Sequence, residues 1–166
     1  MKKLIIPILA FLFAVPAMAQ NRIPDITLKD LNGNAIKVSE VADSGKIVVI
    51  NFWATWCGPC LKELTNINDV IEEWKEKYNI EFIAVSIDDS RTTQKVKPFV
   101  EAKNWVGYKI LLDVASDLKR AMNVLDPPYT FVYDQKGNLY YSHPGYQEGA
   151  EIELEEKIAE LAKLNK

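Results

Sequence analysis

Residues 48–64 read VVINFWATWCGPCLKEL, and this stretch holds both cysteines of the 166-residue chain. An apolar, largely β-branched run covers 46–53, and Cys57 and Cys60 follow soon after it. Runs of this kind are typical of strands that are buried on both faces, as in a parallel sheet. The stretch therefore predicts a buried strand with two closely spaced thiols just past its end.

A helix is predicted directly after this strand. Apolar residues step by four and three positions, which is the spacing of one helical face, at Cys60, Leu64, Ile67, Ile71, Trp74 and Tyr78. Cys57 then falls at the helix N-terminus, where unpaired N–H groups and the macrodipole favour an anion such as a thiolate. The dipole contributes about 0.3–1 kcal/mol, and up to about 2 when partly buried, so it lowers the free-cysteine pKa of about 8.5 by around one unit. Because Cys60 points inward, we expect Cys57 to be the exposed nucleophile and Cys60 the shielded resolving thiol.

The two cysteines could form a structural disulfide that staples the fold, bind a metal ion or act as a reaction centre. A disulfide that closes about four residues stabilises a fold by only about 2 kcal/mol, and it ties one helical turn to itself. Stapling is therefore a poor explanation. Reversible exchange is favoured, in which Cys57 attacks a disulfide and Cys60 resolves the mixed intermediate.

The first 19 residues predict a secretory signal peptide. Two lysines precede an apolar run from Leu4 to Val15, and Ala17-Met18-Ala19 follows as an A-x-A cleavage pattern. The apolar run is shorter than the roughly 20 residues that a membrane span needs, and an uncleaved anchor is the alternative reading. We expect cleavage after Ala19, one domain over 20–166, and a periplasmic or secreted location.

Composition excludes few functions. The chain carries 20 basic and 23 acidic residues, for a formal net charge of −3. No basic run or basic–aromatic stripe is present, so nucleic acid is not an expected partner.

The remaining patterns predict alternating strands and helices. Asn32-Gly33 between two half-apolar runs indicates an N-terminal hairpin. The other predicted elements are a strand over 80–87, a helix over about 92–103, a short strand over 110–112, a helix over 116–123, a hairpin of 129–134 with 139–143, and a helix over 151–164. This order indicates an α/β sandwich.

The sequence resembles the thioredoxin superfamily. WCGPC at 56–60 after VINFWAT carries the resemblance, and Cys-x-x-Cys near a βαβ unit is typical of that superfamily. Within the superfamily, the sequence is most similar to the exported TlpA/ResA group. Three features indicate this: the N-terminal hairpin, the signal peptide and the stretch PYTFVYDQKG at 128–137. The resemblance implies a three-layer sandwich with a mixed central sheet and an N-terminal β-hairpin. It also implies a thiol-disulfide oxidoreductase that passes electrons to other exported proteins, as in cytochrome c maturation.

Five positions take roles from this resemblance. It implies that Trp56 shields the thiols and that Gly58-Pro59 is the dipeptide that tunes the redox potential. It implies that Pro128 is a cis-proline that faces the cysteines and helps to dock the partner. Pro127 stands where the family offers a backbone N–H to that partner, and proline has none.

Other positions depart from the family or are expected to be ordinary. Asn51 replaces the buried acid of cytosolic thioredoxins, so any buried base is elsewhere or absent. Thr65 replaces a proline, which removes the usual reason for a kink in the long helix. His143 is expected at the surface or in packing. Asp88-Asp89 is expected to be solvated, and Trp53, Trp74 and Trp105 are expected in the core or as shields.

The direction of electron flow is expected to be reducing. Gly-Pro is the dipeptide of reducing thioredoxins, and no Lys, Arg or His lies between Ile47 and Leu61 to stabilise a thiolate strongly. An exported reductant must be re-reduced from outside its compartment, which implies a membrane thiol electron donor beside the disulfide-containing exported substrates. A monomer without cofactor or metal is expected. The alternatives are a disulfide oxidase or isomerase, and a copper chaperone, whose relatives space their cysteines by three residues. A peroxidase is disfavoured, because peroxidases carry a threonine three residues before the reactive cysteine and this chain has Ala54 at that position.

Overall fold

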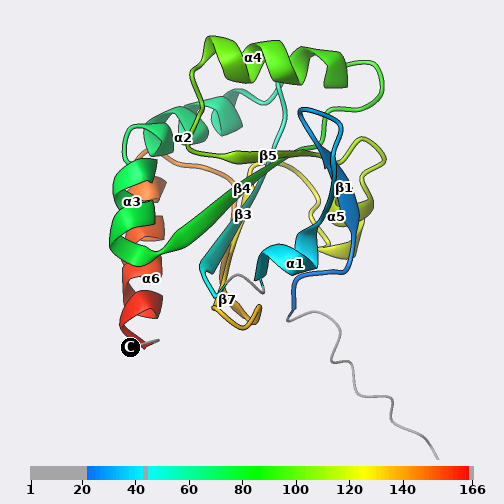
Figure 1. Ribbon diagram of the computed structural model, residues 1–166. Helices are drawn as coiled ribbons and strands as arrows, with labels where there is room; N and C mark the ends of the chain where they lie inside the picture. The colour runs from blue at the N-terminus through cyan, green and yellow to red at the C-terminus, as the bar shows by residue number, and fades with distance from the viewer. Residues whose placement is uncertain (1–21, 43–44, 165–166) are drawn as a thin grey trace, which may run out of the picture.

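The computed structural model describes residues 22–42 and 45–164 and places them around one seven-stranded sheet (Figure 1). Its strand order is β2-β1-β5-β4-β3-β6-β7. The strands are β1 (Thr27–Asp30), β2 (Ala35–Lys37), β3 (Ile47–Trp53), β4 (Ile80–Ser86), β5 (Lys109–Leu112), β6 (Tyr129–Tyr133) and β7 (Leu139–Pro144). The helices are α1 (Val38–Ala42), α2 (Gly58–Asn68), α3 (Ile71–Tyr78), the 3₁₀ helix η1 (Thr93–Lys95), α4 (Val96–Ala102), α5 (Asp117–Ala121) and α6 (Ala150–Leu164).

The sheet is mixed, and β3 lies at its centre. Every residue of β3 is buried, as its apolar run predicts, and β3 pairs in parallel with β4 and antiparallel with β6. β5 continues the parallel part beyond β4, and the β6–β7 hairpin closes the other edge. The mixed α/β architecture predicted from the sequence is confirmed.

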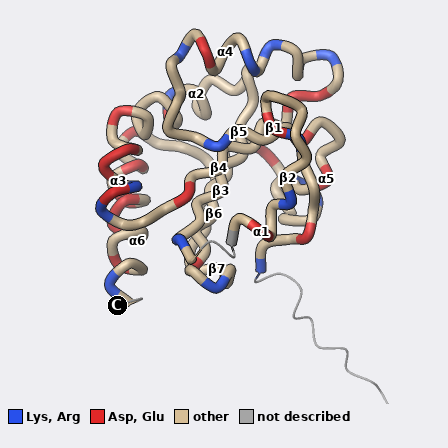
Figure 2. The backbone as a smooth tube through the Cα atoms, in the orientation of Figure 1, with Lys and Arg blue, Asp and Glu red and all other residues tan. Residues whose placement is uncertain are grey.

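Helices cover both sides of this sheet. Figure 1 shows α3 and α6 together on one side and α1 and α5 on the other. The C-terminal helix α6 buries one stripe, Leu154, Ile158 and Leu161, as its periodicity predicts. Figure 2 shows acidic and basic residues side by side along α3, so charge there is mixed rather than of one sign.

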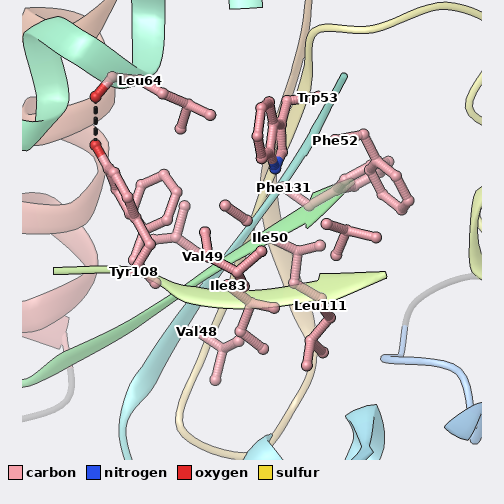
Figure 3. Packing of buried hydrophobic residues seen from close by; sticks show 14 of the residues in the cluster. Val48, Val49, Ile50, Phe52, Trp53, Leu64, Ile83, Tyr108, Leu111 and Phe131 are labelled. Carbon is pink, nitrogen blue, oxygen red and sulfur yellow. Dashed lines mark hydrogen bonds between the residues drawn. The ribbon is translucent and has the colours of Figure 1, made fainter. Parts of the chain in front are cut away.

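Aliphatic and aromatic side chains fill the core between these layers (Figure 3). The ring of Trp53, at the end of β3, lies edge-on to that of Trp105 with centroids 5.2 Å apart. The buried Tyr108 hydroxyl donates to the Leu64 carbonyl of α2 at 2.6 Å, which ties the helix to the segment before β5. Trp53, Trp74 and Trp105 are all buried, as expected.

The N-terminal hairpin is confirmed and extends the sheet. β1 and β2 pair antiparallel around Asn32-Gly33, and Gly33 has φ +85°, a left-handed conformation that glycine adopts without strain. The Asp30 carboxylate accepts hydrogen bonds from the N–H groups of Asn32 and Asn34, which closes the turn. β1 then pairs antiparallel with β5, so the hairpin adds two strands to that edge.

Two expectations are wrong. The long helix after the cysteines is broken at Asp69-Val70 rather than continuous, although its apolar stripe is buried as predicted. The Asp69 N–H donates to the Asn66 and Ile67 carbonyls, a tightened last turn, and Asn and Asp residues compete with helical bonding there. Asp88 is not solvated: it is 1% exposed, and its carboxylate accepts hydrogen bonds from Thr55 and Ser86.

The expected signal peptide over 1–19 lies outside the described residues. Within the described residues, no helix combines the length and the apolar character that crossing a membrane requires.

Candidate functional site

The two cysteines lie where β3 ends and α2 begins, as predicted. Cys57 is the N-cap residue of α2, with extended backbone angles, and Cys60 is in its first turn. They form a disulfide with their Cα atoms 5.3 Å apart. The Cys57 sulfur also accepts a hydrogen bond from the backbone N–H of Cys60 at 3.3 Å. The N-terminus of α2 therefore presents an N–H donor to the sulfur on which a thiolate would form.

The two sulfur-bearing residues differ in exposure in the expected order. Cys60 is fully buried and Cys57 is 7% exposed, so only Cys57 reaches the surface, and by a small margin. Trp56 is 60% exposed beside it. An incoming disulfide can meet Cys57 directly, while Cys60 is accessible only from within the site.

Gly58 and Pro59 form the exposed start of α2. Pro59 stands in the first turn, where the N–H that proline lacks has no helical acceptor. An ideal Cβ on Gly58 meets no heavy atom within 4 Å. A side chain therefore fits at Gly58, and this position can vary without disturbing the fold.

The Pro127–Pro128 segment lies past the same end of the sheet as the cysteines. Tyr129 pairs with Phe52 near the end of β3, so Pro128 precedes β6 where β3 runs into the cysteine loop. The Pro127–Pro128 peptide bond is cis. Pro128 is buried and its carbonyl accepts the Gly145 N–H at 2.8 Å, whereas Pro127 is half-buried. The topology thus brings the two proline residues and the disulfide to the same end of the sheet.

A buried carboxyl that the sequence analysis did not identify lies on α2. Glu63 is 3% exposed. Its Oε2 accepts a hydrogen bond from Asn51 Nδ2 at 3.0 Å, and its Oε1 accepts one from the Thr130 hydroxyl at 3.2 Å. Asn51 Nδ2 also donates to Thr130 Oγ1 at 2.8 Å. A buried carboxyl therefore lies beside Asn51, and it comes from the helix and not from the strand.

The environment of Glu63 prepares it to exchange a proton near neutral pH. Burial raises the pKa of Glu63 from 4.5 to about 7, and the hydrogen bonds from Asn51 and Thr130 oppose part of that rise. Glu63 follows Cys60 by three positions, the spacing that makes side chains neighbours on one face of a helix. The spacing to Cys60 was a usable signal, because a charged residue on an otherwise apolar stripe needs a buried partner. The helix thus carries, one turn after Cys60, a carboxyl that changes its protonation state near neutral pH.

His143 lies on β7 opposite Thr130. Its ring stacks parallel to that of Tyr141 with centroids 6.5 Å apart, and its Nε2 atom is buried without a hydrogen-bond partner among the described residues. The ring is half-buried and packs against Tyr141. In the described part of the chain, no cluster of three or more His, Cys, Asp or Glu side chains is arranged to hold a metal ion.

Comparison with known proteins agrees with the chemistry of the disulfide. The AhpC/TSA family matches residues 19–142. The thiol-disulfide oxidoreductase ResA of Bacillus thuringiensis subsp. konkukian (strain 97-27) is 31% identical over 130 residues, which are 78% of this chain and 72% of ResA. An uncharacterized thioredoxin-like protein from Porphyromonas gingivalis has a similar structure, with a TM-score of 0.75, 42% identity and coverage of 87% of this chain and 93% of that one. A putative thiol:disulfide interchange protein DsbE from Chlorobium tepidum also has a TM-score of 0.75, with 25% identity and coverage of 87% and 97%.

Proposed function

The chain belongs to the AhpC/TSA family and is a TlpA/ResA-like thiol-disulfide oxidoreductase of the thioredoxin superfamily, and we propose that it reduces disulfides in exported proteins. One observation carries the proposal. The redox-active pair Cys57–Cys60 lies at a helix N-terminus, and a buried carboxyl with a pKa of about 7 follows it on the same helix. This set of groups supplies a nucleophile, a resolving thiol and a proton acceptor.

The exchange transfers two electrons in two steps. In the first step the Cys57 thiolate attacks one sulfur of the substrate disulfide, forms a mixed disulfide and releases the other substrate sulfur as a thiolate. In the second step Cys60 gives its proton to the Glu63 carboxylate and attacks the Cys57 sulfur. The second substrate thiolate leaves, and the Cys57–Cys60 disulfide remains, which is the state in the structure.

The surroundings of Cys57 favour reduction of substrates over oxidation. The helix N-terminus and the Cys60 N–H are the groups that would stabilise its thiolate, and no cationic side chain lies between Ile47 and Leu61. Without a strongly stabilised thiolate the reduced form is a good electron donor. Trp56 and the Gly58-Pro59 dipeptide are proposed to shield and tune the pair. Pro127 and Pro128 are proposed to line the path of the bound substrate.

Export and electron supply complete the proposal. The layout of residues 1–19 supports secretion with cleavage after Ala19. A protein that reduces disulfides outside the cytoplasm needs electrons from the other side of the membrane, so a membrane thiol carrier is the proposed donor. Cytochrome c maturation is the proposed setting, and the protein is proposed to act as a monomer.

Insulin reduction in the presence of dithiothreitol tests the proposal. The wild-type protein should accelerate insulin precipitation, and both Cys57→Ala and Cys60→Ala should lose turnover. Cys60→Ala should still form a mixed disulfide, visible as a mass adduct that dithiothreitol removes, whereas Cys57→Ala should not. A trapped adduct on Cys60 in place of Cys57 would reverse the two roles. Tight Cu(I) binding without insulin reduction would support the copper chaperone instead.

A further inference from the structure

Asp88 is a buried carboxylate just past the end of β4, and it binds the loop that leads to Cys57. Its Oδ2 accepts hydrogen bonds from the Thr55 backbone N–H and the Ser86 hydroxyl, both at 2.9 Å, and its Oδ1 accepts one from the Thr55 hydroxyl at 2.6 Å. The Asp88 N–H donates back to Ser86 Oγ at 3.1 Å. Both polar donors of Thr55 are thus held by one carboxylate that is 33 residues away in sequence.

The contact between Asp88 and Thr55 matters because Thr55 lies two residues before Cys57. Thr55 belongs to the three-residue loop 54–56 between β3 and the N-cap residue Cys57. The Ala54 carbonyl accepts the Cys57 N–H at 3.1 Å, which folds the loop back on itself. Only Trp56 separates Thr55 from Cys57, so a shift of Thr55 is passed directly to the cysteine backbone.

We propose that Asp88 is a positioning residue for the thiol exchange, whose carboxylate fixes Thr55 and thereby keeps the Cys57 sulfur beside the N–H of Cys60. The sulfur accepts that hydrogen bond at 3.3 Å in the structure. In the reduced protein the disulfide no longer holds the two residues together, so the loop must keep the sulfur in place. The proposal rests on the proposed role of Cys57 as the nucleophile.

A buried carboxylate suits this task because it is rigidly held. Ionised acceptors form stronger hydrogen bonds than neutral ones, and a buried charge that loses its donors is strongly disfavoured. Asp88 therefore resists displacement of Thr55 more firmly than a neutral acceptor would. Asp88 follows the buried strand β4, so its hydrogen bonds to Thr55 anchor the loop to the parallel β3–β4 pair.

Alkylation of Cys57 in the reduced protein measures the effect. Asp88→Ala frees the loop, so Cys57 should react with iodoacetamide about threefold to tenfold more slowly at pH 7, since a tenfold lower thiolate fraction corresponds to one pKa unit. The titration midpoint of the Cys57 thiol should rise accordingly. Peptide mapping after brief exposure assigns the label to Cys57 rather than Cys60.

Two substitutions at Thr55 separate its hydroxyl from its size. Thr55→Val removes the hydroxyl and keeps the backbone N–H, so it should slow alkylation in the same direction but less than Asp88→Ala does. Thr55→Ser keeps both donors and should react at the wild-type rate. This pair decides the matter even where Asp88→Ala does not fold.

Asp113 provides a matched control for lost stability. It is also 1% exposed, and its carboxylate accepts hydrogen bonds from the N–H groups of Asp117, Leu118 and Lys119 at the start of α5. Asp113→Ala should lower the unfolding temperature as Asp88→Ala does and leave the alkylation rate of Cys57 unchanged.

The positioning role would be overturned by any of the following results, all measured where the variants are folded by circular dichroism. They are an unchanged rate in Asp88→Ala, a faster rate, which would mean that the charge of Asp88 acts on the thiol directly, and an equal slowing in Asp113→Ala. A Thr55→Ser rate as slow as that of Thr55→Val would count against it as well. Wild-type insulin reduction is a separate measurement. If it fails while Asp88→Ala still slows alkylation, the proposed function is lost and the positioning role stands.

Discussion

Glu63→Gln should remove a loss of stability that the wild-type protein undergoes as the pH rises to neutrality. Burial raises the pKa of Glu63 from 4.5 to about 7 in the folded protein. Because the folded-state pKa lies above the unfolded one, the folded protein holds this proton more tightly than the unfolded chain does. The stability that the protonated carboxyl contributes is fully present below about pH 4.5 and is lost as the pH rises through about 7.

The size of the effect follows from the two pKa values. The difference between 4.5 and about 7, at about 1.4 kcal/mol for each pKa unit, amounts to about 3 kcal/mol in the free energy of unfolding. Glutamine has the shape of the protonated acid: its amide oxygen can accept from Asn51, and its amide nitrogen can donate to Thr130 Oγ1 once the Thr130 hydroxyl, which donates to Glu63 in the wild type, turns away. The variant should therefore match the wild type at pH 5 within about 1 kcal/mol and exceed it by up to about 3 kcal/mol at pH 8.

Urea unfolding of the oxidised proteins between pH 5 and pH 8, followed by tryptophan fluorescence, measures this difference. Glu76→Gln, on the exposed face of α3, is the control: it keeps Glu63 and should lose stability with rising pH as the wild type does. Insulin reduction is the second assay: the wild-type rate should rise with a midpoint near pH 7, and the variant should be slower without that midpoint. An equal change in the free energy of unfolding at pH 5 and pH 8 would refute the reasoning, because the carboxyl would then not titrate in the folded protein.

Three further predictions concern docking, potential and export. Replacing Pro127 with Thr restores a backbone N–H, and one more main-chain hydrogen bond of about 0.5–1.5 kcal/mol should speed reduction of generic substrates about twofold to tenfold. An unchanged rate, with the fold intact by circular dichroism, argues that substrate does not dock along this segment. Titration against glutathione and dithiothreitol should place the Cys57–Cys60 couple nearer the thioredoxin value of about −270 mV than the DsbA value of about −120 mV. A value in the DsbA range makes the protein an oxidant or isomerase. N-terminal sequencing from the exporting host should begin at Gln20, and a mature protein that keeps Met1 and fractionates with membranes contradicts cleavage.

The sequence alone determined the features that depend on residues close together in the chain. The buried strand β3 follows from an unbroken apolar run, and the stripe on α2 and α3 follows from steps of three and four positions. The Asn32-Gly33 turn and the cysteine spacing are equally local. Each of these features depends on a short-range periodicity or on a turn, and both are set by residues that are neighbours in the sequence.

The tertiary structure decided which polar residues are buried and what they bind. Glu63 meets Asn51 and Thr130, which are 12 and 67 residues away, and Asp88 meets Thr55 across 33 residues. A carboxylate in a helical or loop pattern reads as solvated because burial is unfavourable unless distant donors converge on it. Asn51 and Thr130 come from the neighbouring strands β3 and β6, and Thr55 comes from the loop after β3. Only the packing of α2 on the sheet gives the buried acid its raised pKa, and only the pairing of β3 with β4 brings Asp88 to the cysteine loop.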